Sequence, residues 1–187
     1  MDNFEALIRL LLEEDGYWTL GSVKVNLSKF DKKELSKPSM PRPELDIVAY
    51  KQSKNELLVM EVKSYLDSYG VRVKDFENLN QEITNGVYKT LTCPKYRETV
   101  ERVLLSDLRK KGFADNKTTI RWGLAAGNIY SKDEIDLRRI FDGQNWQLWG
   151  PNEIAQKARN LASLGYENDP FIIMIKILER NEKASTK

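Results

Sequence analysis

Two apolar segments in the first third of the chain carry ionisable residues. Asp46 lies in "PELDIVAYK", and Glu61 and Lys63 lie in "NELLVMEVKSY". Both segments have the composition of buried strands, where a charge costs free energy unless it is paired or binds a metal. The chain has no histidine and one cysteine. Histidine-dependent triads, histidine zinc sites and an internal disulfide are therefore excluded, which leaves carboxylates, lysine and a hard cation such as Mg²⁺.

The two segments are predicted to form a hairpin with strands at 44–50 and 56–63. Residues alternate between the two faces of a strand, so Glu61 and Lys63 share one face. A tight turn in "KQSKN" sets Asp46 opposite Glu61. A shift of one residue would place Asp46 against an apolar neighbour, so the residue pattern favours this register.

Opposed carboxylates on neighbouring strands have Cβ atoms about 5 Å apart and repel unless a cation lies between them. A divalent metal there would acidify water and neutralise charge on a reacting phosphate, and Lys63 could orient water or stabilise negative charge. The alternative is a surface ladder of ion pairs. In it, Asp46 and Glu61 are held by Lys63 or Arg42, and Glu44 joins the ladder.

These residues resemble the PD-(D/E)XK nuclease superfamily, which includes restriction endonucleases and archaeal Holliday-junction resolvases. "EVK" at 61–63 matches the (D/E)XK half of the motif, and "PELD" at 43–46 resembles the PD half. The resemblance covers about residues 1–130. It implies hydrolysis of phosphodiester bonds in nucleic acid, expected to be DNA, with Mg²⁺ or Mn²⁺. The implied roles are metal ligation by Asp46 and Glu61 and catalysis by Lys63.

The chain departs from the motif after its proline, because Pro43 is followed by Glu44 and the aspartate comes later. Asp46 fits the predicted hairpin, and Glu44 could be a second ligand. If Glu44 were the main ligand, the hairpin would be offset by two residues.

The resemblance implies two further residues. Resolvase-like members have a glutamate in the first helix; Glu5 fits, with Glu13 and Glu14 as competitors nearer the helix end. Some members have a helix glutamine after the lysine strand. Gln81 could take this role, although the expected tyrosine spacing is not met, and a plain surface position is the alternative.

Formal net charge is only +2, but basic residues cluster at 24–42 and 86–111. Such clusters could follow a phosphate backbone, or they could be a solvated loop and helix face. The first cluster falls in a predicted basic loop. Its candidate nucleic-acid contacts are Lys29, Lys32, Lys33, Lys37 and Arg42.

The remaining pattern predicts an α/β fold with a mixed central sheet flanked by helices, and the resemblance implies that its core is restriction-endonuclease-like. The core spans 1–130. A mostly helical extension at 131–187 is expected to pack on it, with a flexible tail after about 180. Helices are expected at 2–15, 75–90, 95–111, 132–141 and 151–165, strands at 17–27, 118–130 and 145–149, and a helix or a strand at 170–180.

Cys93 is expected to be a small buried apolar residue, and the four tryptophans are expected mainly in the core, with base stacking as the alternative. The apolar runs are too short to cross a bilayer and no signal sequence opens the chain, which predicts a cytoplasmic protein with no membrane partner. Two other functions remain open. One is a non-cleaving nucleic-acid- or protein-binding module. The other is a subunit of a defence, repair or mobile-element complex, whose C-terminal segment binds a partner or forms a homodimer.

Overall fold

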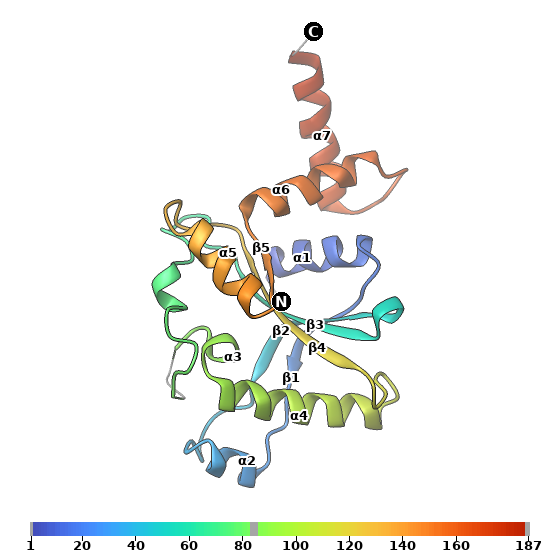
Figure 1. Cartoon of the computed structure of the whole chain (residues 1–187). Coiled ribbons are helices and arrows are strands. Elements are labelled where there is room, and N and C mark those ends of the chain that lie inside the picture. Colours follow the sequence, from blue (N-terminus) through green and yellow to red (C-terminus); the bar gives the residue numbers. More distant parts are fainter. Residues whose placement is uncertain (1, 83–85, 186–187) are drawn as a thin grey trace.

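A computed structural model describes residues 2–82 and 86–185. At its centre is a five-stranded mixed sheet in the order β1-β2-β3-β4-β5 (Figure 1). β1, β2 and β3 are antiparallel neighbours, and β3, β4 and β5 run parallel. The strands are β1 Trp18–Lys24, β2 Glu44–Lys51, β3 Glu56–Lys63, β4 Thr119–Ala126 and β5 Gln147–Trp149. The helices are α1 Asn3–Glu14, α2 Lys29–Glu34, α3 Lys89–Thr92, α4 Pro94–Lys110, α5 Glu134–Gly143, α6 Pro151–Asn160 and α7 Pro170–Ser185.

The predicted α/β class is confirmed, and helices cover both faces of the sheet (Figure 1). α1 and α6 contribute Ile8 and Ile154 to one apolar cluster, which includes Met60 of β3. α4 covers the other face, where Val100 packs in a cluster with Val59 of β3. Alternation along the strands separates these two cores.

The predicted register of the hairpin is confirmed. Pairs run from Lys51↔Glu56 at the turn to Ile47↔Met60. The turn is closed by the Asn55 amide, which donates to the Gln52 carbonyl at 3.1 Å, and Asn55 adopts φ 49°. Asparagine tolerates this left-handed conformation better than most residues, so the turn chemistry and the apolar pattern specify the same pairing.

The prediction of a loop through the first basic cluster is wrong at α2. The Ser28 side chain accepts from the Asp31 amide, while the Asp31 carboxylate accepts from the Ser28 amide, which is a reciprocal helix cap. Asp31 is 6% exposed and pairs with Arg102 of α4. The cap and this ion pair, rather than an apolar stripe, stabilise the helix.

The helix predicted at 75–90 is wrong in the described part of that range; residues 83–85 lie outside the described residues. A short 3-10 helix, Val73–Asp75, ends at the start of that range, and α-helix begins only at Lys89. Upstream, the Asn78 side chain accepts from the Asn80 amide at 2.9 Å, and the Gln81 amide donates to the Thr92 carbonyl at 2.9 Å. These local and long-range bonds replace helical ones, as asparagine-rich segments favour.

The C-terminal third is helical apart from β5, which extends the central sheet. β5 pairs with β4, and Phe141 and Trp146 pack in the core that α4 covers. The sheet and its core therefore continue past the predicted boundary at residue 130.

For residues 170–180, the helical alternative is correct. The Asp169 side chain accepts from the amides of Phe171 and Ile172, which caps α7. α7 projects away from the sheet (Figure 1) and continues past residue 180 to Ser185. Its exposed apolar residues are Ile173, Met174, Ile177 and Leu178. No helix in the described part of the chain is long and apolar enough to cross a membrane.

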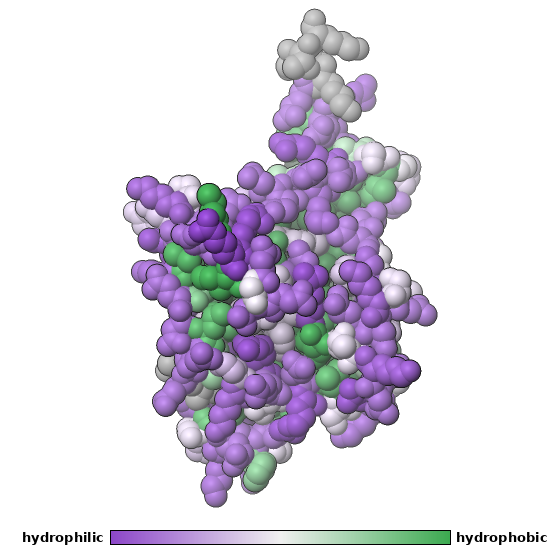
Figure 2. Space-filling model, in the orientation of Figure 1, coloured by the Kyte–Doolittle hydropathy of each residue, from purple (hydrophilic) through white to green (hydrophobic). Residues whose placement is uncertain are grey.

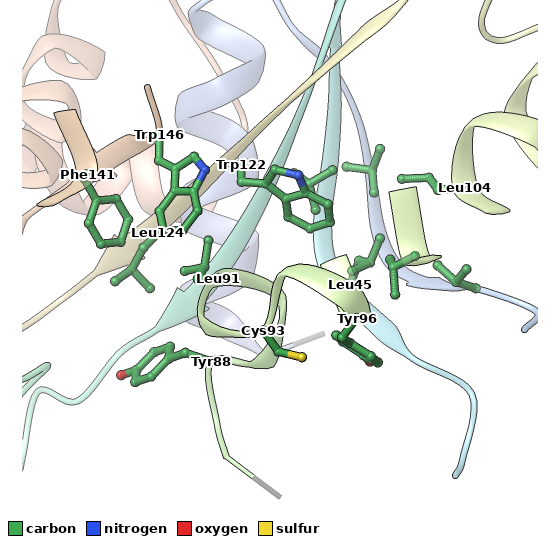
Figure 3. Packing of buried hydrophobic residues seen from close by; sticks show 14 of the residues in the cluster. Leu45, Tyr88, Leu91, Cys93, Tyr96, Leu104, Trp122, Leu124, Phe141 and Trp146 are labelled. Atoms are coloured by element: carbon green, nitrogen blue, oxygen red, sulfur yellow. The ribbon is translucent and has the colours of Figure 1, made fainter. Parts of the chain in front are cut away.

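Cys93 is buried and free, as predicted, in the cluster formed around α3 and the start of α4 (Figure 3). Trp122, Trp146 and Trp149 are also buried, which confirms the core prediction for these three. Trp18 is 77% exposed on the edge strand β1, so it alone among the tryptophans is free to stack on a ligand. The face shown in Figure 2 is mainly hydrophilic, and one group of apolar side chains lies beside α5.

Candidate metal centre

The predicted site lies where β2 and β3 stop pairing. Their last ladder pair is Ile47↔Met60, whereas β3 continues to pair with β4 as far as Lys63. At this point Asp46 Oδ2 accepts from the Val62 amide at 2.8 Å. The Asp46 carboxylate thus satisfies an amide that the ladder no longer uses. This bond holds the carboxylate close to Glu61, the residue opposite it in the same register.

Three oxygens surround the Lys63 ammonium. Lys63 Nζ donates to Glu61 Oε1 at 2.6 Å and to the Val62 carbonyl at 3.1 Å. It also lies 3.6 Å from Asp46 Oδ2. The side chains of the three charged residues are only 16–21% exposed, so solvent screens these charges less than it would at the surface.

Arg42 and Glu44, which the ion-pair alternative placed in the ladder with Asp46 and Glu61, have other partners. Arg42 donates to Asn26 Oδ1 at 3.4 Å, and Glu44 lies 3.8 Å from Lys24 Nζ on β1. Lys63 pairs with both Asp46 and Glu61, as the ion-pair alternative described. Glu44 pairs with Lys24 instead and does not join these three residues. Asp46 and Glu61 are the two carboxylates that the fold brings together.

Burial raises the pKa of Glu61, and the charge of Asp46 acts in the same direction, while Lys63 opposes both. For Lys63, burial would lower the pKa, but the Glu61 charge and hydrogen bond outweigh it and the net direction is upward. The lysine is therefore a protonated cation at neutral pH, and its charge favours the ionised form of Glu61 against the effects of burial and Asp46.

The oxygens around Lys63 are suitable ligands for a hard divalent cation: two carboxylates and one backbone carbonyl. The cation would have to displace the ammonium, after which Lys63 would be free to face a substrate. Within residues 2–82 and 86–185, no group of three or more acidic, cysteine or histidine side chains could hold a metal. Asp46, Glu61 and the Val62 carbonyl would supply only part of the coordination shell of such a cation, and water or substrate oxygens would have to supply the rest.

Glu5 approaches the same site from α1. One of its carboxylate oxygens is buried with no hydrogen-bond partner among the described residues. Burial raises the pKa of Glu5, and the charge of Asp46 raises it further. Of its competitors, Glu13 instead accepts from Thr19 and pairs with Arg9. Electrostatic contact with Asp46 thus distinguishes Glu5 from the glutamate at the helix end.

Glu5→Gln is expected to stabilise the metal-free protein at neutral pH by roughly 0.5 kcal/mol, a small effect because Glu5 is partly exposed. A raised folded-state pKa means that ionised Glu5 destabilises the fold. Wild-type stability should therefore fall, relative to the variant, as pH rises from about 4.5, and the difference should level off above the folded-state pKa. Urea unfolding at several pH values measures this difference. Glu14→Gln, at an exposed position of α1, is the control, and parallel pH profiles for wild type and Glu5→Gln would contradict the assignment.

A pocket of about 170 Å³ opens beside Glu61. Arg42, Glu44, Lys89 and Tyr96 contribute to its walls. Lys89 is close enough for its charge to lower the pKa of Glu61. Sequence reasoning did not single out Lys89 or Tyr96, although Lys89 belongs to the basic cluster at 86–111.

The other predicted nucleic-acid contacts are dispersed. Lys29, Lys32 and Lys33 lie on α2 and Lys37 follows it, and none of these four lines the pocket beside Glu61. Gln81 is not on a helix and lines a separate pocket with Tyr65 and Tyr88. Only Arg42 of the predicted basic set reaches the site itself.

Comparisons with protein families, with characterised proteins and with solved structures find no match to this chain.

Proposed function

We propose that the protein is a Mg²⁺-dependent nuclease of the PD-(D/E)XK type with a restriction-endonuclease-like core, and that its substrate is DNA. The observation that carries this proposal is the convergence of Glu61, Asp46 and the Val62 carbonyl on one cation position. That position lies at the end of a hairpin whose register is the one predicted from the apolar pattern around Asp46 and Glu61. Mn²⁺ would bind the same oxygens.

The proposed residues would act by electrostatics and positioning, without a covalent intermediate. Asp46, Glu61 and the Val62 carbonyl would hold the cation. A divalent cation there supplies positive charge to the phosphate and lowers the pKa of the attacking water. Lys63, released from Glu61, would orient that water or neutralise charge developing on phosphate oxygens. Glu5, beside Asp46, could accept a proton, because its raised pKa makes it a better base than an ordinary carboxylate.

The direct test is incubation of circular single- and double-stranded DNA, and of circular RNA, with Mg²⁺ or Mn²⁺ against EDTA. We expect metal-dependent nicking of DNA circles, which would also identify an endonuclease. Binding of DNA without cleavage of any circle, with either metal, would instead support the non-cleaving module. Neither binding nor cleavage would contradict both.

A prediction for α2 concerns salt dependence. If Lys29, Lys32 and Lys33 contact phosphates, replacing all three with alanine should flatten a log–log plot of DNA affinity against salt by about 0.9 per lost contact. Turnover of bound DNA should change little, because such contacts stabilise ground and transition states alike. Fluorescence anisotropy at several salt concentrations measures the slope. Lys132→Ala is the control, and an unchanged slope in the triple variant would place the footprint at 86–111.

A further inference from the structure

A second and larger pocket, of about 570 Å³, adjoins the metal centre. Its volume lies in the range of about 300–1,000 Å³ typical of small-molecule sites. We call it the tyrosine pocket and define it by Tyr65, Tyr69, Tyr88, Lys74 and Gln81. None of its tyrosines has a role in the proposed hydrolysis, so the pocket requires a separate explanation.

The tyrosine pocket neighbours the pocket beside Glu61. Val87 lines both this pocket and the one beside Glu61. Tyr65 follows Lys63 by two residues and is close enough for the two side chains to interact electrostatically. We therefore expect a strand with one phosphate at Glu61 to reach the tyrosine pocket with a neighbouring nucleotide.

The loop that carries the tyrosines is held in an unusual shape. Tyr65 adopts φ 46°, a left-handed conformation that is unfavourable for an aromatic residue. Strained residues of this kind tend to cluster at functional sites. Gly70 has φ 82°, and a Cβ there would lie 2.7 Å from the Asn128 carbonyl oxygen. The Asn128 side chain donates to the Ser68 carbonyl at 2.8 Å. Attachment to the turn after β4 thus fixes the loop on both sides of Tyr69.

The pocket offers the groups that recognise a nucleobase. Tyr69 is 81% exposed, which leaves its ring available for stacking. Tyr88 is buried and its ring packs against that of Phe76, with the centroids 4.7 Å apart, so it forms a fixed wall of the pocket. The side-chain amide of Gln81 can donate to and accept from a base edge. The exposed Lys74 can pair with a phosphate.

We propose that the tyrosine pocket binds one unpaired nucleobase of the strand whose phosphate lies at the metal centre. This rests on the proposed function, because the phosphate is placed by Glu61 and its neighbours. A base inside an intact duplex is not accessible to such a pocket. The substrate therefore has a single-stranded, frayed or branched segment at the cleavage site.

The test is fluorescence anisotropy with a short fluorescein-labelled single-stranded oligodeoxynucleotide, with Ca²⁺ in place of Mg²⁺. Tyr69→Ala should weaken binding about tenfold, equivalent to about 1.4 kcal/mol, as expected for loss of one stacked base. Tyr166→Ala, which removes a 93% exposed tyrosine outside the pocket, is the matched control and should leave affinity unchanged. In a series of oligonucleotides with one abasic position each, one position should lower the affinity of wild type by a similar factor. The same oligonucleotide should cause no further loss of affinity in Tyr69→Ala.

Equal affinity of Tyr69→Ala and wild type, or losses that add at every abasic position, would overturn the inference. Cleavage of the same oligonucleotide by wild type with Mg²⁺ is scored separately. Cleavage without an effect of Tyr69→Ala on binding would refute the role of the tyrosine pocket and support the nuclease function. Binding that depends on Tyr69, without cleavage, would support the role of the pocket and refute the nuclease function. The absence of binding by wild type would refute both.

Discussion

Glu61→Gln and Lys63→Met should each lower the rate of metal-dependent cleavage by about 10²–10³-fold or more, the scale of losing one preorganised electrostatic group. Glutamine keeps the shape of Glu61 but supplies a weaker ligand without charge. Methionine keeps most of the volume of Lys63 but removes the only cation within 4 Å of both carboxylates among the described residues. Single-turnover cleavage of saturating DNA measures the chemical step, and thermal unfolding monitors the fold.

The controls remove the same types of charge elsewhere. Glu167→Gln and Lys132→Met change exposed residues outside the pocket beside Glu61 and should retain wild-type rates. Wild-type cleavage by both site variants, with unchanged unfolding temperatures, would refute the assignment of the site. Loss of cleavage with a large drop in unfolding temperature would call for the rate to be measured again at lower temperature.

A divalent cation should stabilise the wild-type protein, and Asp46→Asn should reduce that stabilisation. Ligand binding to the folded state adds about 2.7 kcal/mol when the free concentration is 100 times the Kd. Asparagine keeps an oxygen that can accept from the Val62 amide, so the hairpin should survive while the ligand charge is lost. Thermal unfolding over a titration of Mg²⁺, Mn²⁺ or Ca²⁺ measures the shift. The Ca²⁺ titration is repeated with DNA present, because Mg²⁺-type sites often need substrate phosphates.

Glu44→Gln is the matched comparison, since Glu44 lies on the same strand and also borders the pocket beside Glu61. If Glu44 is only paired with Lys24, its variant should keep the full metal-dependent shift. A full shift in Asp46→Asn together with its loss in Glu44→Gln would exchange the roles of the two residues. No shift in wild type with any cation and DNA would exclude the metal centre.

The hairpin could be predicted because its information is local. Alternating apolar residues and a short turn define a single register, and that register decides which charges meet. The α2 helix was missed because part of its stabilisation is not local. Its Ser28–Asp31 cap is a local signal, but the ion pair between Asp31 and Arg102 joins residues far apart in the sequence.

The parts of the site that sequence did not predict come from the region between β3 and α4, where the local pattern did not give the path of the chain. Lys89 acts on Glu61 from the first turn of α3, and Tyr65 acts on Lys63 from the loop after β3. The paths of these segments depend on tertiary contacts, such as the bond from the Gln81 backbone amide to the Thr92 carbonyl. The position of the Lys63 ammonium was also unpredictable in detail, because strand spacing gives the face of a side chain but not its rotamer. A pattern can therefore place the carboxylates without describing the pocket around them.

The parallel pairing of β5 with β4 sets a limit on where the chain can be shortened. Removing everything after residue 130 would strip β4 of a neighbour and leave an apolar interior strand as an open edge. Phe141 and Trp146 would leave the core at the same time, uncovering their contacts with Phe76 and Arg97. Open apolar edges recruit other strands, so such a fragment would tend to aggregate. β5 thus shields the edge of β4 and keeps the strands that carry the site from pairing with other chains.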